Sequence, residues 1–214
     1  MSKKLIALVG VASVIFAAPV FAGPVPQTTY FPVASMAVKI NYVLPVLCDS
    51  NMNAAANTLN AIGANFQLTG TTQNYTSTYF DATQDPGFVN IQDGSGMSSV
   101  MQTIIWHYDS PGLPDESIDA SIYVNADRLY YDTGDTSKSS DLICGSSITS
   151  SNIGQRIDFQ SAMLHEFGHV MGMDHRTDGL TGPCVMTTYL NAGQIKRSFC
   201  ADEKGLMLGF YGTR

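Results

Sequence analysis

The chain has 214 residues and a formal net charge of −7, from 18 acidic and 11 basic side chains. This length is enough for one domain with a sizeable core. An acidic chain without a basic cluster is a poor partner for nucleic acid or for an anionic membrane surface, so we expect neither function.

The N-terminus has the pattern of a secretory signal peptide. Two lysines precede the apolar run 5–18, and small residues occupy the −3 and −1 positions of a cleavage site after Ala22. The run is too short, and is interrupted too soon by Pro19, to be a membrane anchor. Removal of residues 1–22 leaves 192 residues and takes two lysines, which moves the net charge to −9. We therefore expect a secreted or periplasmic protein.

Residues 23–36 contain three prolines and are expected to be an extended leader before a single domain, 37–214. Alternating apolar residues predict a strand over 37–43. Helical spacing predicts a helix over 51–62, with Asp49 or Ser50 as its cap and Gly63 as its stop. Further β-prone runs lie at 66–68, 88–92, 103–108 and 121–125.

The region 132–155 is rich in loop-forming residues and contains three aspartates, Asp132, Asp135 and Asp141. Carboxylates of this kind can bind calcium, but three aspartates in loose spacing do not define a calcium cage. We therefore expect solvated loop charge there and count no calcium site.

The segment from His165 to His175 reads HEFGHVMGMDH and has the pattern H-E-x-x-H-x-x-G-x-x-H. Asp158 is the expected N-cap of a helix through this segment. Residues four apart lie on one face of a helix, so His165 and His169 can offer two nitrogens to one point in space. Gly172 can take the left-handed conformation that ends a helix, after which His175 can approach the same point.

Three neutral histidines with one open position are typical of a catalytic zinc site, because a structural site fills its fourth position with another side chain. Glu166 is then better interpreted as the base that acts on water at the metal than as a ligand. The alternative is an amphipathic helix that happens to carry histidines. Three of the chain's four histidines fall at the motif positions, however, and only His107 is left over. We therefore expect one zinc ion per chain.

Two functions without catalysis use the same three ligands. One is a metal-dependent adhesin or peptide-binding module, and the other is a zinc-buffering protein. Neither requires a glutamate at position 166, so Glu166 favours an enzyme.

Four cysteines in an exported protein most simply form two disulfides, and three pairings are possible. Cys184 and Cys200 flank one short segment near the motif, so we pair them and leave Cys48 with Cys144. A last helix is expected from about Asp202 to Phe210.

The long zinc motif followed by Met186 resembles the metzincin metallopeptidases, in which a Met-turn follows the motif. Within that group the chain is most similar to the matrixin, or matrix metalloproteinase-like, branch. Three further segments resemble the strand before the active-site helix, the start of that helix and the closing helix: IDASIYVN at 118–125, RIDFQS at 156–161 and ADEKGLMLGFYG at 201–212.

The resemblance implies an α+β zincin fold with a twisted mixed sheet, an active-site helix and a small C-terminal subdomain. It implies that His165, His169 and His175 bind zinc, that Glu166 is general base and then acid, and that Met186 forms the floor beneath the metal. The implied reaction is hydrolysis of internal peptide bonds in a peptide or protein substrate that lies extended beside the sheet edge. The enzyme is expected to be a monomer.

Three features depart from the matrixin pattern. Arg176 follows the third histidine, where matrixins usually carry serine. Tyr189 lies three residues after Met186 rather than two, so we expect no catalytic role for it. Residues 23–36 contain no cysteine and are too few for a cysteine-switch prosegment, so any latency must have another origin.

Overall fold

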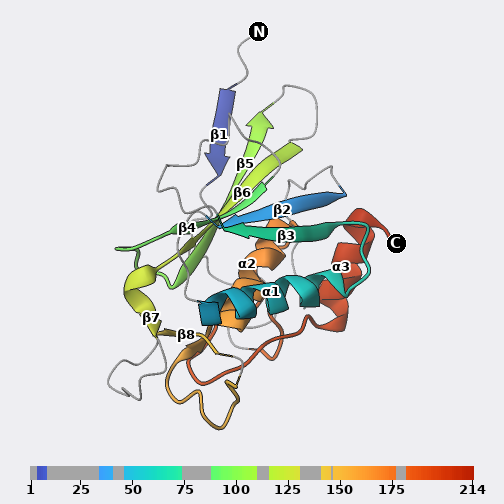
Figure 1. The fold of residues 1–214 in the computed structure, drawn as a ribbon. Helices are drawn as coiled ribbons and strands as arrows, with labels where there is room; N and C mark the ends of the chain where they lie inside the picture. The colour runs from blue at the N-terminus through green and yellow to red at the C-terminus, as the bar shows by residue number, and fades with distance from the viewer. Residues whose placement is uncertain are drawn as a thin grey trace, which may run out of the picture.

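The α+β class expected from the sequence is confirmed. The computed structural model describes residues 4–8, 34–40, 46–73, 88–109, 116–130, 141–145, 147–176 and 182–214. These residues form a six-stranded mixed sheet, a small three-stranded sheet and three α-helices. Figure 1 shows the helices α1, α2 and α3 on the same side of the large sheet.

The large sheet has the strand order β1-β5-β6-β4-β2-β3. Its parallel strands are β2 (Ser35–Ile40), β3 (Gln67–Gln73), β4 (Phe88–Asp93) and β6 (Glu116–Val124). The strand β5 (Met101–Asp109) pairs antiparallel with β6, and β1 (Lys4–Leu8) pairs antiparallel with β5. Parallel neighbours need a crossover connection, and the helix α1 (Val46–Asn60) provides it between β2 and β3.

The strand β1 lies within the stretch expected to be a signal peptide, and it pairs with Ile105–Asp109 of β5. Residues 9–33, which include the expected cleavage site and most of the expected leader, lie outside the described part of the chain. Cleavage after Ala22 therefore stays a prediction. The strand β2 begins at Ser35, two residues before the strand expected from the alternation, and residues 41–43 of that expected strand are not described.

The expected cap of the first helix is wrong. Asp49 and Ser50 lie inside α1, which begins at Val46 and ends at Asn60. The fully buried Cys48 is bonded to Cys144, and this tertiary link holds a helical turn that helical spacing alone does not predict. Gly63 adopts a φ of 81° just beyond the helix, as expected for a stop residue.

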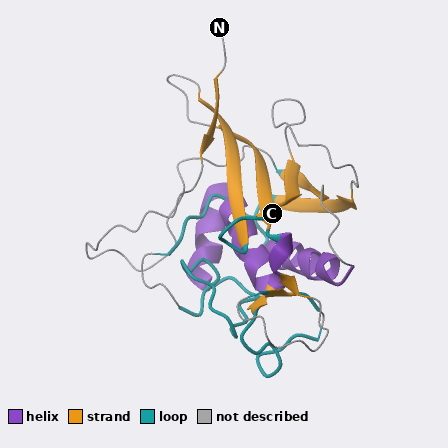
Figure 2. Cartoon of the chain, turned by 90° about the vertical axis from the view of Figure 1, so that its left-hand side faces the viewer, coloured by secondary structure: helices purple, strands orange, loops and turns teal. Residues whose placement is uncertain are grey.

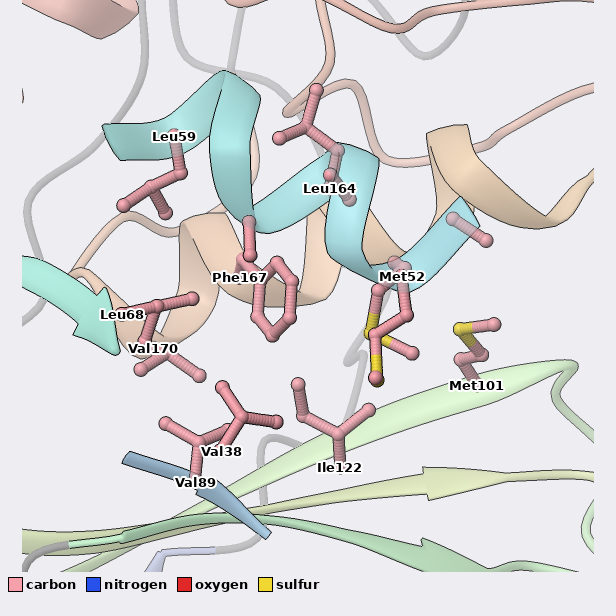
Figure 3. Close-up of a cluster of buried hydrophobic side chains, with 14 of the residues drawn as sticks. Val38, Met52, Leu59, Leu68, Val89, Met101, Ile122, Leu164, Phe167 and Val170 are labelled. Carbon is pink, nitrogen blue, oxygen red and sulfur yellow. The ribbon is translucent and has the colours of Figure 1, made fainter. Parts of the chain in front are cut away.

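The main core lies between the large sheet and the helices. Figure 3 shows Val38, Val89 and Ile122 from the sheet facing Phe167 and other apolar side chains of the helices. All four of these side chains are at most 1% exposed, so the contact between sheet and helices is closely packed. This core fixes α2 against the sheet, and α2 carries the first half of the zinc motif.

The smaller sheet lies on the other side of the helices, among the loops (Figure 2). Its strands β7 (Leu129–Tyr130), β8 (Leu142–Ile143) and β9 (Ile157–Asp158) are parallel, and the short 3-10 helix η1 (Ala126–Arg128) precedes β7. Within the loop-rich region 132–155 the structure adds the strand β8, whose two residues are too few to leave a periodic signal. Within the same region, Asp141 lies 3.6 Å from the Arg128 guanidinium, whereas the other two aspartates considered for calcium lie outside the described residues.

The chain after the zinc motif ends in the helix α3 (Ala201–Tyr211), one residue longer at each end than expected. The two disulfides are Cys48–Cys144 and Cys184–Cys200, which confirms the expected pairing. Within the described ranges, none of the helices has both the length and the apolar character needed to span a bilayer.

Candidate metal centre

The helix α2 (Phe159–Val170) begins where the sequence predicts. The Asp158 carboxylate accepts a hydrogen bond from the Ser161 backbone N–H at 2.9 Å, which caps the first turn. The Arg197 guanidinium donates to both oxygens of the same carboxylate. Asp158 is fully buried, so this ion pair holds the start of α2 to the segment that precedes α3.

The three motif histidines converge on one point. His165 Nε2 lies 3.1 Å from His169 Nε2 and 3.2 Å from His175 Nε2, and the three ligand atoms all lie within 4.8 Å of one another. Three nitrogens bound to one tetrahedral zinc at ~2.0–2.1 Å would be about 3.3 Å apart. Two of the separations therefore already match those of a metal site, and the group could hold a metal ion.

The hydrogen bonds of the other ring nitrogens make this arrangement specific. His165 Nδ1 lies 2.8 Å from the Val185 carbonyl oxygen, and His169 Nδ1 lies 2.8 Å from that of Met173. A carbonyl oxygen only accepts, so each Nδ1 carries the hydrogen and each Nε2 of a neutral ring carries a lone pair. Two lone pairs then face each other at 3.1 Å with no hydrogen between them. A bound cation relieves this repulsion, and the donor set therefore fits a metal.

The electrostatics keep two of the three histidines neutral. Burial lowers the pKa of His165 well below its usual value, and the neighbouring His169 lowers it further. Burial and His169 also lower the pKa of His175 to about 4, against the opposing effect of Asp174. Both imidazoles are therefore unprotonated at neutral pH, where their lone pairs are available to a metal.

Glu166 lies beside the ligands and is not one of the three converging groups. Its side chain is only 7% exposed, and burial raises the pKa of its carboxyl, while His169 and the Thr103 hydroxyl oppose this rise. The Thr103 hydroxyl on β5 donates to Glu166 Oε2 at 2.6 Å. Glu166 is thus a buried carboxylate with a single hydroxyl donor, adjacent to a candidate metal site.

Met186 packs against the last turn of α2, at Gly168. A Cβ at Gly168 would overlap the Met186 sulfur, so a larger residue at this position would force the methionine side chain to shift. Gly172 has a φ of 84°, and the chain turns there so that His175 can approach the two helical histidines, as the motif predicts. The Arg176 backbone N–H then donates to the Met186 carbonyl at 2.8 Å, which joins the end of the motif to the methionine turn.

Glu203 of α3 stabilises the turn that contains Met186. It is fully buried, and its two oxygens accept from the Met186 and Cys200 backbone N–H groups, each at 2.8 Å. The Arg176 guanidinium lies 2.7 Å from Asp202 and 3.8 Å from Glu203. Arg176, the position that departs from the matrixin pattern, therefore pairs with the first turn of α3.

Two other residues considered in the sequence are not assigned to the centre. Tyr189 is 53% exposed, and the side chain of His107 lies outside what the structure describes. A separate hollow of about 280 Å³ lies between α1 and the strands β2 and β3, and its lining contains no ionisable side chain.

Sequence reasoning missed Thr103, Gly168 and Glu203. Gly168 left a signal, because a glycine inside a helix costs about 1 kcal/mol relative to alanine and often marks a close approach. The other two left no signal, because their partners are distant in the sequence.

A scan against protein-family models and a search of curated proteins both find no match for this chain.

Proposed function

We propose that this protein is a zinc-dependent endopeptidase of the metzincin type, with most similarity to the matrixin branch. The observation that carries the proposal is the meeting of three Nε2 atoms, two of them in tautomers set by backbone carbonyls, beside a buried glutamate that is not a ligand. Structural zinc sites use four protein ligands, whereas catalytic sites use three and leave one position open.

Zinc is the metal that this donor set favours. Imidazole nitrogens suit zinc, copper, iron and nickel, whereas calcium and magnesium take oxygen ligands. The Val185 and Met173 carbonyls supply the second hydrogen bond that histidine ligands of zinc usually make. When bound, zinc supplies a Lewis acid that lowers the pKa of water and polarises a carbonyl group.

The protein's own contribution to hydrolysis is proton transfer by Glu166. Its carboxylate takes the proton of the attacking water as the carbon–oxygen bond forms. It then gives a proton to the amine nitrogen as the carbon–nitrogen bond breaks, which balances the reaction. Burial of Glu166, which raises the pKa of its carboxyl, makes it a better base than an exposed glutamate.

The strand β5 is the element beside which we place the substrate. Thr103 of this strand contacts Glu166, so β5 passes next to the centre. In the full chain, before the proposed cleavage after Ala22, the strand β1 covers β5 only over Ile105–Asp109, and the end at Met101–Ile104 lies beyond that pairing. An extended peptide can add to such an edge through main-chain hydrogen bonds, with one peptide bond brought to the metal.

The two disulfides agree with an oxidising compartment, so we propose that the protein acts outside the cytoplasm, secreted or in the periplasm. A peptide or protein is the proposed substrate, and a monomer contains every residue of the centre. The net charge of −7 gives no reason to add nucleic acid as a partner.

The substitution Glu166→Gln separates the endopeptidase from a zinc-dependent binding module. Zinc should stay at one equivalent, because the three imidazoles remain, and folding should change little. Loss of a positioned general base costs ~10²–10⁴ in rate, so cleavage of a peptide library should fall by at least that factor. Metal analysis after dialysis, together with mass spectrometry of the digested library, measures both quantities.

His169→Ala should lose zinc and activity together, and His107→Ala is its matched control, which should keep its zinc. Wild-type protein that holds one zinc and cuts no peptide in a broad library would make the binding module the better account. Cleavage by Glu166→Gln at the wild-type rate would remove the assigned role of the glutamate.

A further inference from the structure

We propose that Thr103 is a positioning residue for Glu166, whose hydroxyl holds one carboxylate oxygen and leaves the other free for the proton of the attacking water. The proposal rests on the function proposed above. It assigns to the sheet a part in the reaction, beyond its part in binding an extended peptide.

The hydrogen bond between the two side chains is short. Thr103 Oγ1 lies 2.6 Å from Glu166 Oε2 and 3.4 Å from the Glu166 backbone oxygen. A hydroxyl has one hydrogen, and the shorter distance is that of an O–H donor to a charged carboxylate. The hydrogen therefore points to Oε2, and the longer contact to the backbone oxygen is secondary.

Among the described residues, the Thr103 hydroxyl is the only side-chain donor on the Glu166 carboxylate, at Oε2, and the backbone of Thr103 adds a contact that acts in the same direction on the carboxyl pKa. A buried carboxylate that is only 7% exposed loses solvation and needs such a donor. Because one oxygen is held, the carboxylate cannot rotate freely, and the lone pairs of Oε1 stay available. The two oxygens therefore have different tasks.

The position of the hydroxyl is set by elements other than α2. Thr103 lies on β5, whose pairing with β6 places it opposite Ile122. The branched side chain of threonine has few χ1 rotamers in a strand, so the backbone of β5 largely decides where the hydroxyl points. The sheet thereby restrains the orientation of a group on the helix, which reduces the cost of reaching the reactive geometry.

Thr103→Val and Thr103→Ser test the proposal in the zinc-loaded full chain. Valine keeps the shape and removes the hydroxyl, and kcat should fall about 10- to 100-fold, the range seen when outer hydrogen-bonding partners in metal sites are lost. KM should stay unchanged, because the hydroxyl acts on Glu166 rather than on the substrate. Serine keeps the hydroxyl and should restore most of kcat. All variants should hold one zinc.

Thr69→Val is the matched control. Thr69 is also a strand threonine, although it is exposed, and its hydroxyl reaches the Met36 carbonyl at 3.4 Å on β2, in the pairing between β2 and β3. Its removal should leave kcat unchanged. If Thr103→Val cuts at the wild-type rate, or if Thr103→Ser is as slow as Thr103→Val, the positioning role is refuted. A rise in KM at unchanged kcat would assign Thr103 to substrate binding instead.

A second measurement needs no substrate. In metal-free protein, Thr103→Val should lower the melting temperature by about 2–8 °C, because it leaves a buried carboxylate oxygen without its donor. In the Glu166→Ala background the same change should have almost no further effect, since the partner is absent. Equal shifts in melting temperature in both backgrounds would refute the hydrogen bond itself.

Zinc-loaded wild-type protein that cuts nothing would overturn the proposed function, and the positioning role with it.

Discussion

Glu203 is the side chain whose loss we expect to weaken the fold and the metal centre together. It is fully buried and accepts from two backbone N–H groups, those of Met186 and Cys200. Glu203→Ala removes both acceptors at once. Each hydrogen bond to a charged group contributes about 1.5–3 kcal/mol, so the free energy of unfolding should fall by roughly 3–6 kcal/mol. This is a large part of the ~5–15 kcal/mol that holds a typical domain folded.

The metal centre should respond as well, because the Met186 turn also carries the Val185 carbonyl that accepts from His165 Nδ1. Partners that orient a metal ligand typically change metal affinity about 10- to 100-fold when they are lost, and we expect Glu203→Ala to reduce zinc affinity within that range. The zinc affinity and stability of Glu203→Gln should lie between those of the wild type and those of Glu203→Ala. An amide can accept from one N–H, but it turns its own NH₂ towards the other.

Urea unfolding followed by far-UV circular dichroism, with the disulfides intact and a chelator present, measures the stability. Competition with a chelator of known affinity measures zinc binding. Lys204→Ala is the control on α3, because Lys204 is exposed, and it should change stability by less than about 0.5 kcal/mol. A loss of less than about 1 kcal/mol for Glu203→Ala would show that the two N–H groups find other acceptors, and the reasoning would be wrong.

Two further predictions concern the disulfides and pH. Cys184→Ser should cost about 3 kcal/mol and Cys48→Ser about 4.7 kcal/mol, because the closed loops differ in length, with sequence separations of 16 and 96. Urea midpoints test this order, and equal or reversed costs would contradict it. Burial lowers the pKa of His165 and of His175 below that of the unfolded chain, near 6.5, and for His175 to about 4. In the metal-free protein, the contribution of these two histidines to the free energy of unfolding is therefore fully present above pH 6.5. It is lost as the pH falls towards about 4, since the unfolded chain binds more protons there. A urea midpoint that stays constant from pH 7 to pH 4.5 would contradict this sign.

The helix that carries the motif was predictable because its information is local. A helical repeat places His165 and His169 on one face, Asp158 caps the first turn, and the left-handed Gly172 ends the last. Each of these features depends on residues within a few positions of one another. For the same reason, three strands of the large sheet, β2, β4 and β5, were predicted to within three residues of their bounds.

The start of the first helix could not be predicted from neighbouring residues alone. Its spacing predicts a start near Asn51, yet α1 begins at Val46, in a turn that contains the disulfide-bonded Cys48. The strand β8 was missed because two residues carry no period and are held only by parallel neighbours. In both cases a distant part of the chain decides the local structure.

The sequence by itself determined which groups meet at the candidate metal centre: three histidines, a glutamate next to them, and a methionine downstream. Only the tertiary structure decided how they are held. The Thr103 hydroxyl on Glu166, the Val185 carbonyl at His165 and the Glu203 carboxylate at Met186 join residues 63, 20 and 17 positions apart. A short motif records the spacing of side chains on one helix, but these contacts depend on where the sheet, the methionine turn and the last helix pack around it.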